Sequence, residues 1–330
     1  MKAAYIVKPG PPESIVYGDL PMKEPAAAQV RVKVAAVAVN PIDTYIRAGM
    51  IGGTLPEPFI VGCDVAGTVD AVGPEVKLFQ PGDRVWGSNQ GLFGRQGTFA
   101  EYAVIDSEWL YPTPPQVSDR DAAATALVGI TAHLGLFEHA QLKAGETLFV
   151  RGGTGGVGSC VVQMAKAIGA RVITTAGSDE KVEAARQLGA DAAINYKTQD
   201  LDLAIRAFAP GGVNLWWETL RQQNFDQIVS HLARRGRIVV MAGRDARPPF
   251  PVGPFYTKDC TMYGFAMFNA AADEQRQVAG DINRWLSEGK LRAQIGRVMP
   301  LAQAAAAHRL QEDNTLRGAG TLSGKIVLEP

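Results

Sequence analysis

A glycine-rich segment between an expected strand and an expected helix carries the clearest chemistry in this sequence. The run TLFVRGGTGGVGSCVVQMAKAIGA places three glycines in the spacing Gly-x-Gly-x-x-Gly. Glycines at these positions permit a tight turn, close approach of the backbone to a pyrophosphate, and close packing of helix on strand. The helix N-terminus also attracts the anion. Although a glycine-rich turn alone can be a plain loop, this context predicts a dinucleotide site made of Gly153, Thr154, Gly155, Gly156, Val157 and Gly158.

The end of the next expected strand indicates which dinucleotide is bound. An acidic residue about twenty positions after the glycines would bind the ribose hydroxyls of NAD. Here the segment RVITTAGSDEK ends its strand in neutral residues, so Ser178 and Lys181 could hydrogen-bond and neutralise a phosphate. This pattern favours NADPH. The alternative is that Ser178 caps the following helix and Lys181 lies on its solvated face, and both roles can coexist.

The elements that must position this loop alternate between strand and helix. The strand-like runs RVITTA, AAINY, VNLWWET and RIVVMAG each follow a helix-like run, which predicts a doubly wound parallel sheet of the Rossmann type. Its last strand is expected at CTMYGFAMF, followed by helices near residues 273–287 and 302–311 and a closing strand KIVLE. Residues 1–123 instead show short alternating runs between Pro and Gly clusters, which predicts a β-rich region.

The length, charge and cysteine content of the chain argue against several classes of function. A chain of 330 residues suits two domains. Lys plus Arg equals Asp plus Glu, 33 against 33, which argues against binding to nucleic acid or to an anionic membrane. The three cysteines suggest neither a disulfide framework nor a metal-ligand pair. No long apolar segment suggests export or a membrane span, so a cytoplasmic protein is expected.

Several motifs together resemble one known family, the zinc-independent quinone oxidoreductase and zeta-crystallin branch of the medium-chain dehydrogenase/reductase superfamily. They are VNPIDTYIRAG, VGCDVAGTVDAVG, PGDRVWG, GTFAEYAV, AAATALVGITAH and GGTGGVG, and they run nearly from end to end. The resemblance implies a GroES-like catalytic domain built from both ends of the chain. We expect its first part at 1–123, a Rossmann NADP-binding domain at 124–266 and the return to the catalytic domain at 267–330.

The resemblance also bears on metal binding. Zinc-dependent members of the superfamily place cysteine, histidine and cysteine at the positions that match Asn40, Cys63 and Leu127. A catalytic zinc needs about three protein ligands, and one of these three residues could serve. We therefore expect no zinc, and we interpret Cys63 as a small buried apolar residue.

The resemblance places Asn40, Asp43 and Tyr45 beside the nicotinamide as catalytic candidates. An amide or a tyrosine hydroxyl can stabilise negative charge that develops on a substrate oxygen, and Tyr45 could supply a proton. The alternative is structural: Asn40 fixes a turn before proline, Asp43 caps the next helix, and Tyr45 packs its ring. The resemblance further implies cofactor contacts from Thr131, Tyr196, Gly243, Phe265, Ala266 and Met267.

The substrate side is suggested by two expected loops, residues 51–58 and 88–96, with Met50, Trp86 and Phe93 as apolar candidates for a planar organic acceptor. By resemblance the expected reaction is metal-free hydride transfer from NADPH to a quinone. Enones, enals or acrylate-type substrates are the first alternative. A structural or RNA-binding crystallin-like protein is an alternative of another class, and a zinc alcohol dehydrogenase is a further one.

The strand-like segment CTMYGFAMF also bears on assembly. At the edge of the expected sheet it would pair with its two-fold mate, so the resemblance implies a homodimer.

Overall fold

The computed structural model describes residues 1–51 and 53–330, and its chain forms two compact units. Unit 1 comprises Met1–Ile130 and Ala270–Pro330, and unit 2 comprises Thr131–Asn269. These junctions lie a few residues after the boundaries expected from sequence. Within the described residues, none of the helices has the length and apolar character needed to cross a membrane.

Unit 1 is built on a seven-stranded sheet. Its strands alternate apolar and polar residues, so one face of the sheet packs against a hydrophobic core. Strand order is β15-β16-β3-β5-β6-β8, and β7 also pairs with β3. A second sheet has the order β2-β1-β4. The strands are β1 (Lys2–Ile6), β2 (Val16–Asp19), β3 (Gln29–Val39), β4 (Phe59–Ile60), β5 (Val65–Val72), β6 (Arg84–Gly87), β7 (Tyr102–Asp106), β8 (Leu110–Pro112), β15 (Ile295–Pro300) and β16 (Lys325–Glu329).

Among the described residues, four α-helices accompany these strands, and the later two follow the apolar periodicity seen in the sequence. The helix expected near 302–311 begins as the 3₁₀ turn η5 (Leu301–Gln303) and continues beyond the expected end. The helices are α1 (Pro41–Arg47), α2 (Asp119–His133), which crosses the junction between the units, α8 (Ala272–Ser287) and α9 (Ala304–Thr315), with 3₁₀ turns η1 (Pro12–Ser14) and η2 (Ser107–Trp109).

Unit 2 is a doubly wound domain, as the alternation of strand and helix patterns predicted. Its six strands are all parallel and have the order β11-β10-β9-β12-β13-β14. This order reverses direction beside the first strand, β9, which is where such sheets bind ligands. The strands are β9 (Thr147–Val150), β10 (Arg171–Ala176), β11 (Ala192–Asn195), β12 (Val213–Glu218), β13 (Leu232–Val240) and β14 (Thr261–Gly264).

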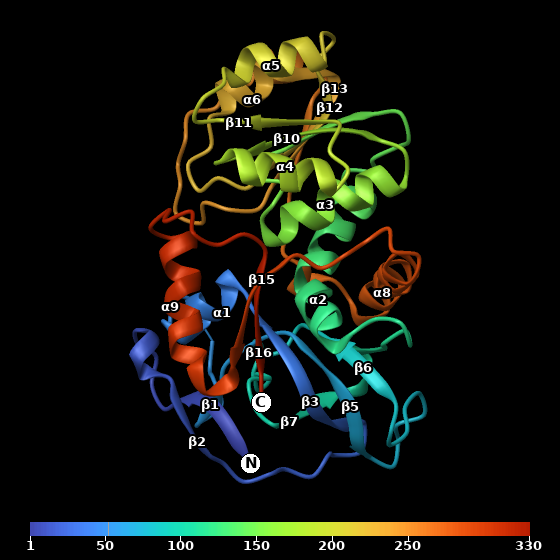
Figure 1. The fold of residues 1–330 in the computed structure, drawn as a ribbon, viewed down its shortest axis with the longest axis vertical. Coiled ribbons are helices and arrows are strands. Elements are labelled where there is room, and N and C mark those ends of the chain that lie inside the picture. The colour runs from blue at the N-terminus through green and yellow to red at the C-terminus, as the bar shows by residue number, and fades with distance from the viewer. Residues whose placement is uncertain (52) are drawn as a thin grey trace. The chain divides into compact units, whose positions relative to one another are not determined.

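Helices cover both faces of this sheet. In Figure 1, α3 (Gly156–Ala167) and α4 (Asp179–Gln187) lie on one face, and α5 (Leu201–Phe208) and α6 (Phe225–His231) lie on the other. The unit also contains α7 (Val252–Thr257), the π-helical turn η3 (Leu134–His139) and the 3₁₀ turn η4 (Met267–Asn269). The strand expected over the whole of CTMYGFAMF is shorter in the structure. β14 ends at Gly264, because its partner β13 ends at Val240, opposite that residue.

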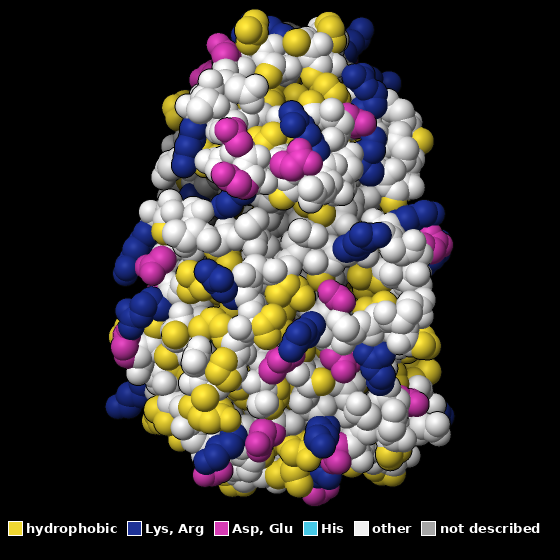
Figure 2. Space-filling model, viewed as in Figure 1, with side chains coloured by type: hydrophobic (Ala, Val, Ile, Leu, Met, Phe, Trp, Pro, Cys, Tyr) yellow, Lys and Arg dark blue, Asp and Glu magenta, His cyan; other side chains and the backbone are white. Residues whose placement is uncertain are grey.

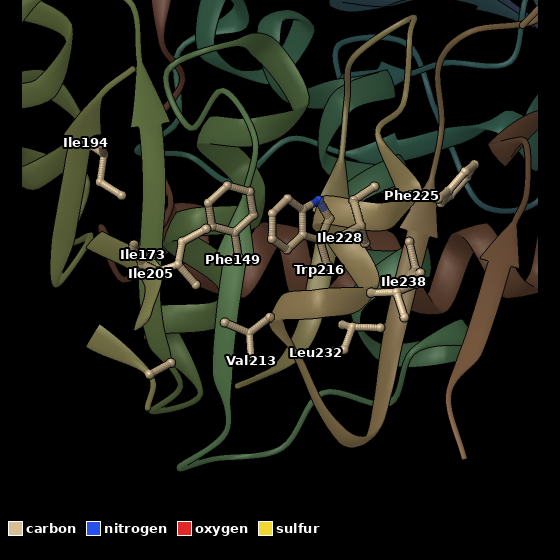
Figure 3. Packing of buried hydrophobic residues seen from close by; sticks show 12 residues of the cluster. Phe149, Ile173, Ile194, Ile205, Val213, Trp216, Phe225, Ile228, Leu232 and Ile238 are labelled. Carbon is tan, nitrogen blue, oxygen red and sulfur yellow. The ribbon is translucent and has the colours of Figure 1, made fainter. Parts of the chain in front are cut away.

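The core of unit 2 is centred on two aromatic rings from neighbouring strands (Figure 3). Phe149 on β9 stacks on Trp216 of β12 with ring centroids 3.8 Å apart. The indole N–H of Trp216 donates to Glu218 over 3.0 Å, so its polar atom is satisfied inside the core. Trp216 and Trp217 are both fully buried, so both side chains belong to this core.

Candidate active site and cofactor-binding residues

Five polar or titratable side chains meet in the interior of unit 1. They are 0% to 5% exposed, and we call them the buried polar cluster: Asn40, Asp43, Cys63, Asp64 and Lys325. Buried charges are costly unless they are paired and hydrogen-bonded. Their gathering in one place therefore marks a candidate functional site.

Strand register brings the cluster together. Ile326 on β16 is opposite Val39 on β3, so the preceding Lys325 lies beside Asn40, which follows β3. Val65 on β5 is opposite Gly87 on β6, so Asp64 lies beside Ser88 by the same register. Segments from three regions of the chain thus converge at the ends of adjacent strands.

Asp64 is the centre of the cluster, and the sequence reasoning missed it. Its Oδ2 accepts from Asn40 Nδ2 at 2.8 Å, and its Oδ1 accepts from Ser88 Oγ at 2.8 Å and from the Leu127 backbone N–H at 3.1 Å. Lys325 Nζ lies 3.8 Å from Oδ2. Burial raises the pKa of Asp64, and Lys325 and these donors oppose that shift. The carboxylate thus fixes an amide, a hydroxyl and a helix backbone together.

The Asn40 amide is oriented by its two charged neighbours. Its Oδ1 accepts from Lys325 Nζ, which also donates to the Val39 carbonyl at 2.8 Å. Its Nδ2 donates to Asp64 and, at 3.2 Å, to the Ala38 carbonyl, so both amide hydrogens are used. In this arrangement Asn40 has no N–H to offer a substrate oxygen. The catalytic contact expected of Asn40 therefore stays a prediction, and in this arrangement its amide is held by Lys325 and Asp64.

Asp43 holds the start of α1, as the structural alternative proposed. Its Oδ2 accepts from the Asn40 backbone N–H at 2.7 Å, and the carboxylate also interacts with the Cys63 thiol. Burial raises the Asp43 pKa to about 7, with nearby Asp64 adding to the rise. Burial also raises the pKa of the Cys63 thiol, and Asp43 contributes. Cys63 is buried as expected, but its neighbours are carboxylates and not solely apolar groups.

The raised pKa of Asp43 predicts a pH-dependent stability. The folded chain holds this proton up to about pH 7, whereas the unfolded carboxyl loses it near pH 4. The folded state therefore binds more protons between these values, and Asp43 lowers the free energy of unfolding as pH rises from about 4 to about 7. Replacing Asp43 with Asn should remove this contribution, which urea unfolding of both proteins across that range would measure.

The comparison must be a difference between the two proteins, because His308 acts in the opposite direction. Burial lowers the pKa of His308 to about 3. The unfolded state therefore binds more protons at this residue, and His308 raises the free energy of unfolding as pH rises through that range. Parallel stability curves for the wild type and the Asp43→Asn variant would contradict the assignment.

The donor set does not fit a catalytic zinc ion. The three positions that match the ligands of zinc-dependent relatives lie around Asp64: Asn40 and Leu127 hydrogen-bond to it, and Cys63 precedes it in the chain. The Lys325 ammonium lies beside the Asn40 amide oxygen, and an ammonium cannot donate electrons to a metal. Among the residues described, no group of three or more His, Cys, Asp or Glu side chains could hold a metal ion.

Tyr45 lies two residues after Asp43 on the same helix and is half-buried. Of the three catalytic candidates it is the one with an accessible side chain.

The glycine loop of unit 2 has the close contacts that its spacing predicted. A Cβ on Gly153 would lie 2.3 Å from Thr174 Oγ1, and a Cβ on Gly158 would lie 2.2 Å from the Gly152 carbonyl oxygen. A Cβ on Gly155 would be 3.4 Å from its nearest neighbour, which is an ordinary contact, and Gly155 is exposed. The loop therefore packs tightly against its own strand and helix, and its middle glycine leaves the backbone accessible. These residues fit a bound pyrophosphate.

An ion pair beneath this loop was not found from sequence. Arg151 directly follows β9, and its Nε lies 3.6 Å from Glu218 Oε2 at the end of β12. The Arg151 guanidinium also lies over the Phe149 and Trp216 rings. Thr219 Oγ1 donates to the Arg151 carbonyl at 2.8 Å, so the strand ends that support the loop are linked to each other.

The residues expected near an adenosine phosphate lie at the end of β10 and after β11. Ser178 Oγ accepts from the Lys181 backbone N–H at 3.4 Å, so Ser178 caps α4. A Cβ on Gly177 would lie 2.7 Å from the Tyr196 hydroxyl, which places Tyr196 beside this strand end. Tyr196 is 54% exposed.

The other expected cofactor residues lie in separate parts of unit 2. Thr131 is buried in α2, and Gly243 has a φ of +82°, with its Cα against the Arg221 carbonyl. Phe265 packs on His139 with ring centroids 4.5 Å apart. Ala266 accepts a hydrogen bond from the Asn269 N–H through its carbonyl, and Met267 is buried at the start of η4.

The three apolar substrate candidates differ in exposure. Met50 is 42% exposed and Phe93 is 69% exposed, so both can contact a ligand. The prediction that Trp86 lines the substrate site is wrong, because the residue is 1% exposed. It packs on Tyr111 and donates through its indole N–H to Asn283 Oδ1 at 2.9 Å. Its ring belongs to the core of unit 1. Gly52, in the expected loop 51–58, lies outside the described residues.

Known proteins similar to this chain share both of its parts. Residues 26–115 match the family of alcohol dehydrogenase GroES-like domains, and residues 156–284 match the zinc-binding dehydrogenase family. The Mus musculus quinone oxidoreductase is 32% identical, covering 99% of this chain and 97% of its own. A Burkholderia 2-haloacrylate reductase is 29% identical, covering 99% of this chain and 98% of its own.

Solved structures agree with these matches. The Escherichia coli quinone oxidoreductase complexed with NADPH superposes with a TM-score of 0.87 at 25% identity, covering 100% of both chains. The fold is therefore that of the medium-chain dehydrogenases/reductases, with a GroES-like part and a Rossmann part. With a quinone oxidoreductase 32% identical over almost the full length, the chain belongs to the quinone oxidoreductase and zeta-crystallin branch of that superfamily.

Proposed function

We propose that this protein is an NADPH-dependent quinone oxidoreductase that needs no metal. The observation that carries the proposal is full-length similarity to quinone oxidoreductases, joined to a glycine loop whose packing leaves room for a pyrophosphate. NADPH, when bound, supplies a hydride to the quinone, and the protein binds, orients and polarises the reactants. Hydride addition reduces the quinone to a quinol anion, and one proton completes the quinol.

The residues of unit 2 would hold the cofactor. Backbone N–H groups of the glycine loop and the N-terminus of α3 would bind the pyrophosphate. Ser178, Lys181 and Tyr196 would bind the 2'-phosphate, which an acidic residue at that strand end would repel. Ser178 caps α4 with one lone pair of its hydroxyl oxygen and donates its hydroxyl hydrogen to the Glu180 carboxylate, so the hydroxyl would turn from Glu180 to donate to a phosphate.

The residues of unit 1 would polarise the substrate. Tyr45 is the proposed hydrogen-bond donor to the negatively charged oxygen that develops on the substrate. Its side chain is half-buried, and it lies two residues after Asp43, the buried cap of α1. Asn40 and Asp43 would set the position of α1 and thereby that of Tyr45.

NADPH oxidation by purified, metal-analysed protein tests the proposal, with a quinone such as 9,10-phenanthrenequinone, an enal, an enone and a simple ketone as acceptors. The highest kcat/KM is expected with the quinone. Turnover confined to a simple ketone, together with about one zinc ion per chain, would contradict it and indicate a zinc alcohol dehydrogenase.

Reduction of an activated double bond is the second candidate, favoured by the 29% identical 2-haloacrylate reductase. Hydride addition to a conjugated alkene builds charge on the same kind of oxygen, so the same residues serve both reactions. The acceptor panel separates the two. An RNA-binding role is less favoured, because basic and acidic side chains are interspersed over the described residues that Figure 2 shows.

Cofactor selectivity gives a prediction for the phosphate-binding residues. Replacing Ser178 and Lys181 together with Ala should raise the KM for NADPH about tenfold or more, and the KM for NADH much less, because NADH has no 2'-phosphate. Steady-state kinetics with both nucleotides measures this. Lys197→Ala is a matched control at an exposed lysine after β11. Equal effects on the two nucleotides would contradict the assignment.

We also propose a homodimer. Strand β14 lies at the end of the strand order in unit 2, where it can pair with a second copy. Sedimentation velocity would show a concentration-independent monomer if this is wrong. The proposed compartment is the cytoplasm, where the buried free thiols of Cys63 and Cys160 stay reduced.

A further inference from the structure

The Lys325 side chain is a buried cation in an acidic surrounding. It is 5% exposed and interacts electrostatically with Asp43, Cys63 and Asp64. Its ammonium donates to the Val39 carbonyl at 2.8 Å and to Asn40 Oδ1, and it lies 3.8 Å from Asp64 Oδ2. The partners are two neutral oxygens and one carboxylate oxygen, which are the kinds of atom that a bound metal cation would also attract.

The positions around this ammonium are those that would hold zinc in zinc-dependent relatives. The side chain at position 40 contacts Lys325 directly, and the backbone at position 127 hydrogen-bonds to Asp64, which also faces Lys325. We infer that Lys325 is the resident cation of this site and excludes divalent metal from it. This inference concerns metal exclusion and does not depend on the proposed quinone reductase activity.

Electrostatics supplies the reason. A divalent ion placed among these residues would lie within a few ångströms of a buried like charge, and Coulomb repulsion is strong at that distance in the protein interior. The ammonium also occupies the Asn40 oxygen, and it provides the positive charge that Asp64 needs in the interior. Removing Lys325 would open a position and leave the acidic groups without their cation.

Cobalt binding tests this inference directly. The double variant Asn40→Cys/Leu127→Cys supplies three thiols with Cys63, and it is compared with the triple variant that also carries Lys325→Gln. Co²⁺ is titrated into each full-length protein, and the thiolate-to-cobalt charge-transfer absorption gives the dissociation constant. We expect binding at least tenfold tighter when Lys325 is replaced. Equal affinity in the two backgrounds, including no binding in either, would overturn the inference.

Matched controls separate this effect from a general effect of losing a lysine. Lys258 in unit 2 donates to the backbone carbonyls of Val229, Ser230 and Leu232 and has no part in the cluster. Lys258→Gln in the double-cysteine background should leave cobalt affinity unchanged. Adding Cys63→Ser to the triple variant should weaken the charge-transfer band, because one thiolate is lost. A similar rise in affinity with Lys258→Gln would assign the effect to something other than the buried ammonium.

A second measurement tests the same charge without cobalt or added cysteines. If Lys325 balances Asp64, Lys325→Gln alone should destabilise the protein more at pH 8 than at pH 5, because the uncompensated carboxyl must ionise at the higher pH. Combining it with Asp64→Asn should reduce that pH dependence, leaving the part contributed by Asp43, whose pKa of about 7 Lys325 also lowers. A loss of stability that is equal at both pH values, or that persists unchanged in the combined variant, would show that Lys325 is not the counter-ion and would overturn the inference.

Discussion

Replacing Gly158 with Ala is expected to weaken NADPH binding by at least 100-fold. The new Cβ would lie 2.2 Å from the Gly152 carbonyl oxygen and 3.2 Å from Gly153 Cα. Both neighbours are backbone atoms, so the loop and the start of α3 must separate. That movement displaces the N–H groups proposed to bind the pyrophosphate and should cost about 1–3 kcal/mol of folding stability. Isothermal titration with NADPH and urea unfolding measure the two effects.

A neighbouring glycine separates packing from cofactor access. Gly155→Ala places a Cβ 3.4 Å from its nearest atom, which is ordinary contact, so its stability should stay near that of the wild type. Its NADPH affinity should still fall, because the methyl group occupies the space proposed for the pyrophosphate. Gly253→Ala, whose Cβ would meet nothing within 4 Å, is the control expected to change neither property. Unchanged NADPH affinity in Gly158→Ala would refute the loop assignment.

The second large effect is expected at the centre of the buried polar cluster. Asp64→Ala removes the acceptor for Asn40, Ser88 and the Leu127 N–H, and it removes the buried carboxylate that faces the Lys325 ammonium. Removing one partner of a buried ion pair costs about 3–5 kcal/mol. Since whole domains are stable by about 5–15 kcal/mol, unit 1 would become marginal. Urea unfolding followed by circular dichroism gives the change in free energy.

Asp70 provides a matched control on the same strand, β5. It bonds to Arg31 at 2.6 Å, but its side chain is 32% exposed. Such surface pairs contribute about 0.2–1 kcal/mol, so Asp70→Ala should be mild. If Asp64→Ala and Asp70→Ala destabilise the protein equally, then Asp64 does not organise the cluster. A folded Asp64→Ala protein should also have a lower kcat, because Asn40 and the start of α1 lose their fixed orientation.

Features encoded in short segments were predictable from sequence. The glycine loop lies between β9 and α3 within about twenty residues, so its role follows from local spacing. The parallel sheet followed from alternating periodicities, and the cap formed by Asp43 followed from its place three residues after Asn40. In each of these cases the interacting atoms are close in the chain, and local conformation alone brings them together.

Features that depend on strand register were decided by the tertiary structure. Lys325 and Asn40 are 285 residues apart, and the pairing of β16 with β3 brings them into contact. Trp86 resembles a ligand-lining aromatic in sequence, yet packing on Tyr111 and a hydrogen bond to Asn283 bury it. The sequence by itself determined the glycine loop between β9 and α3, because one turn of chain forms it. The tertiary structure alone determined the buried polar cluster, because its charges are stable in the interior only when distant strands bring their partners within hydrogen-bonding distance.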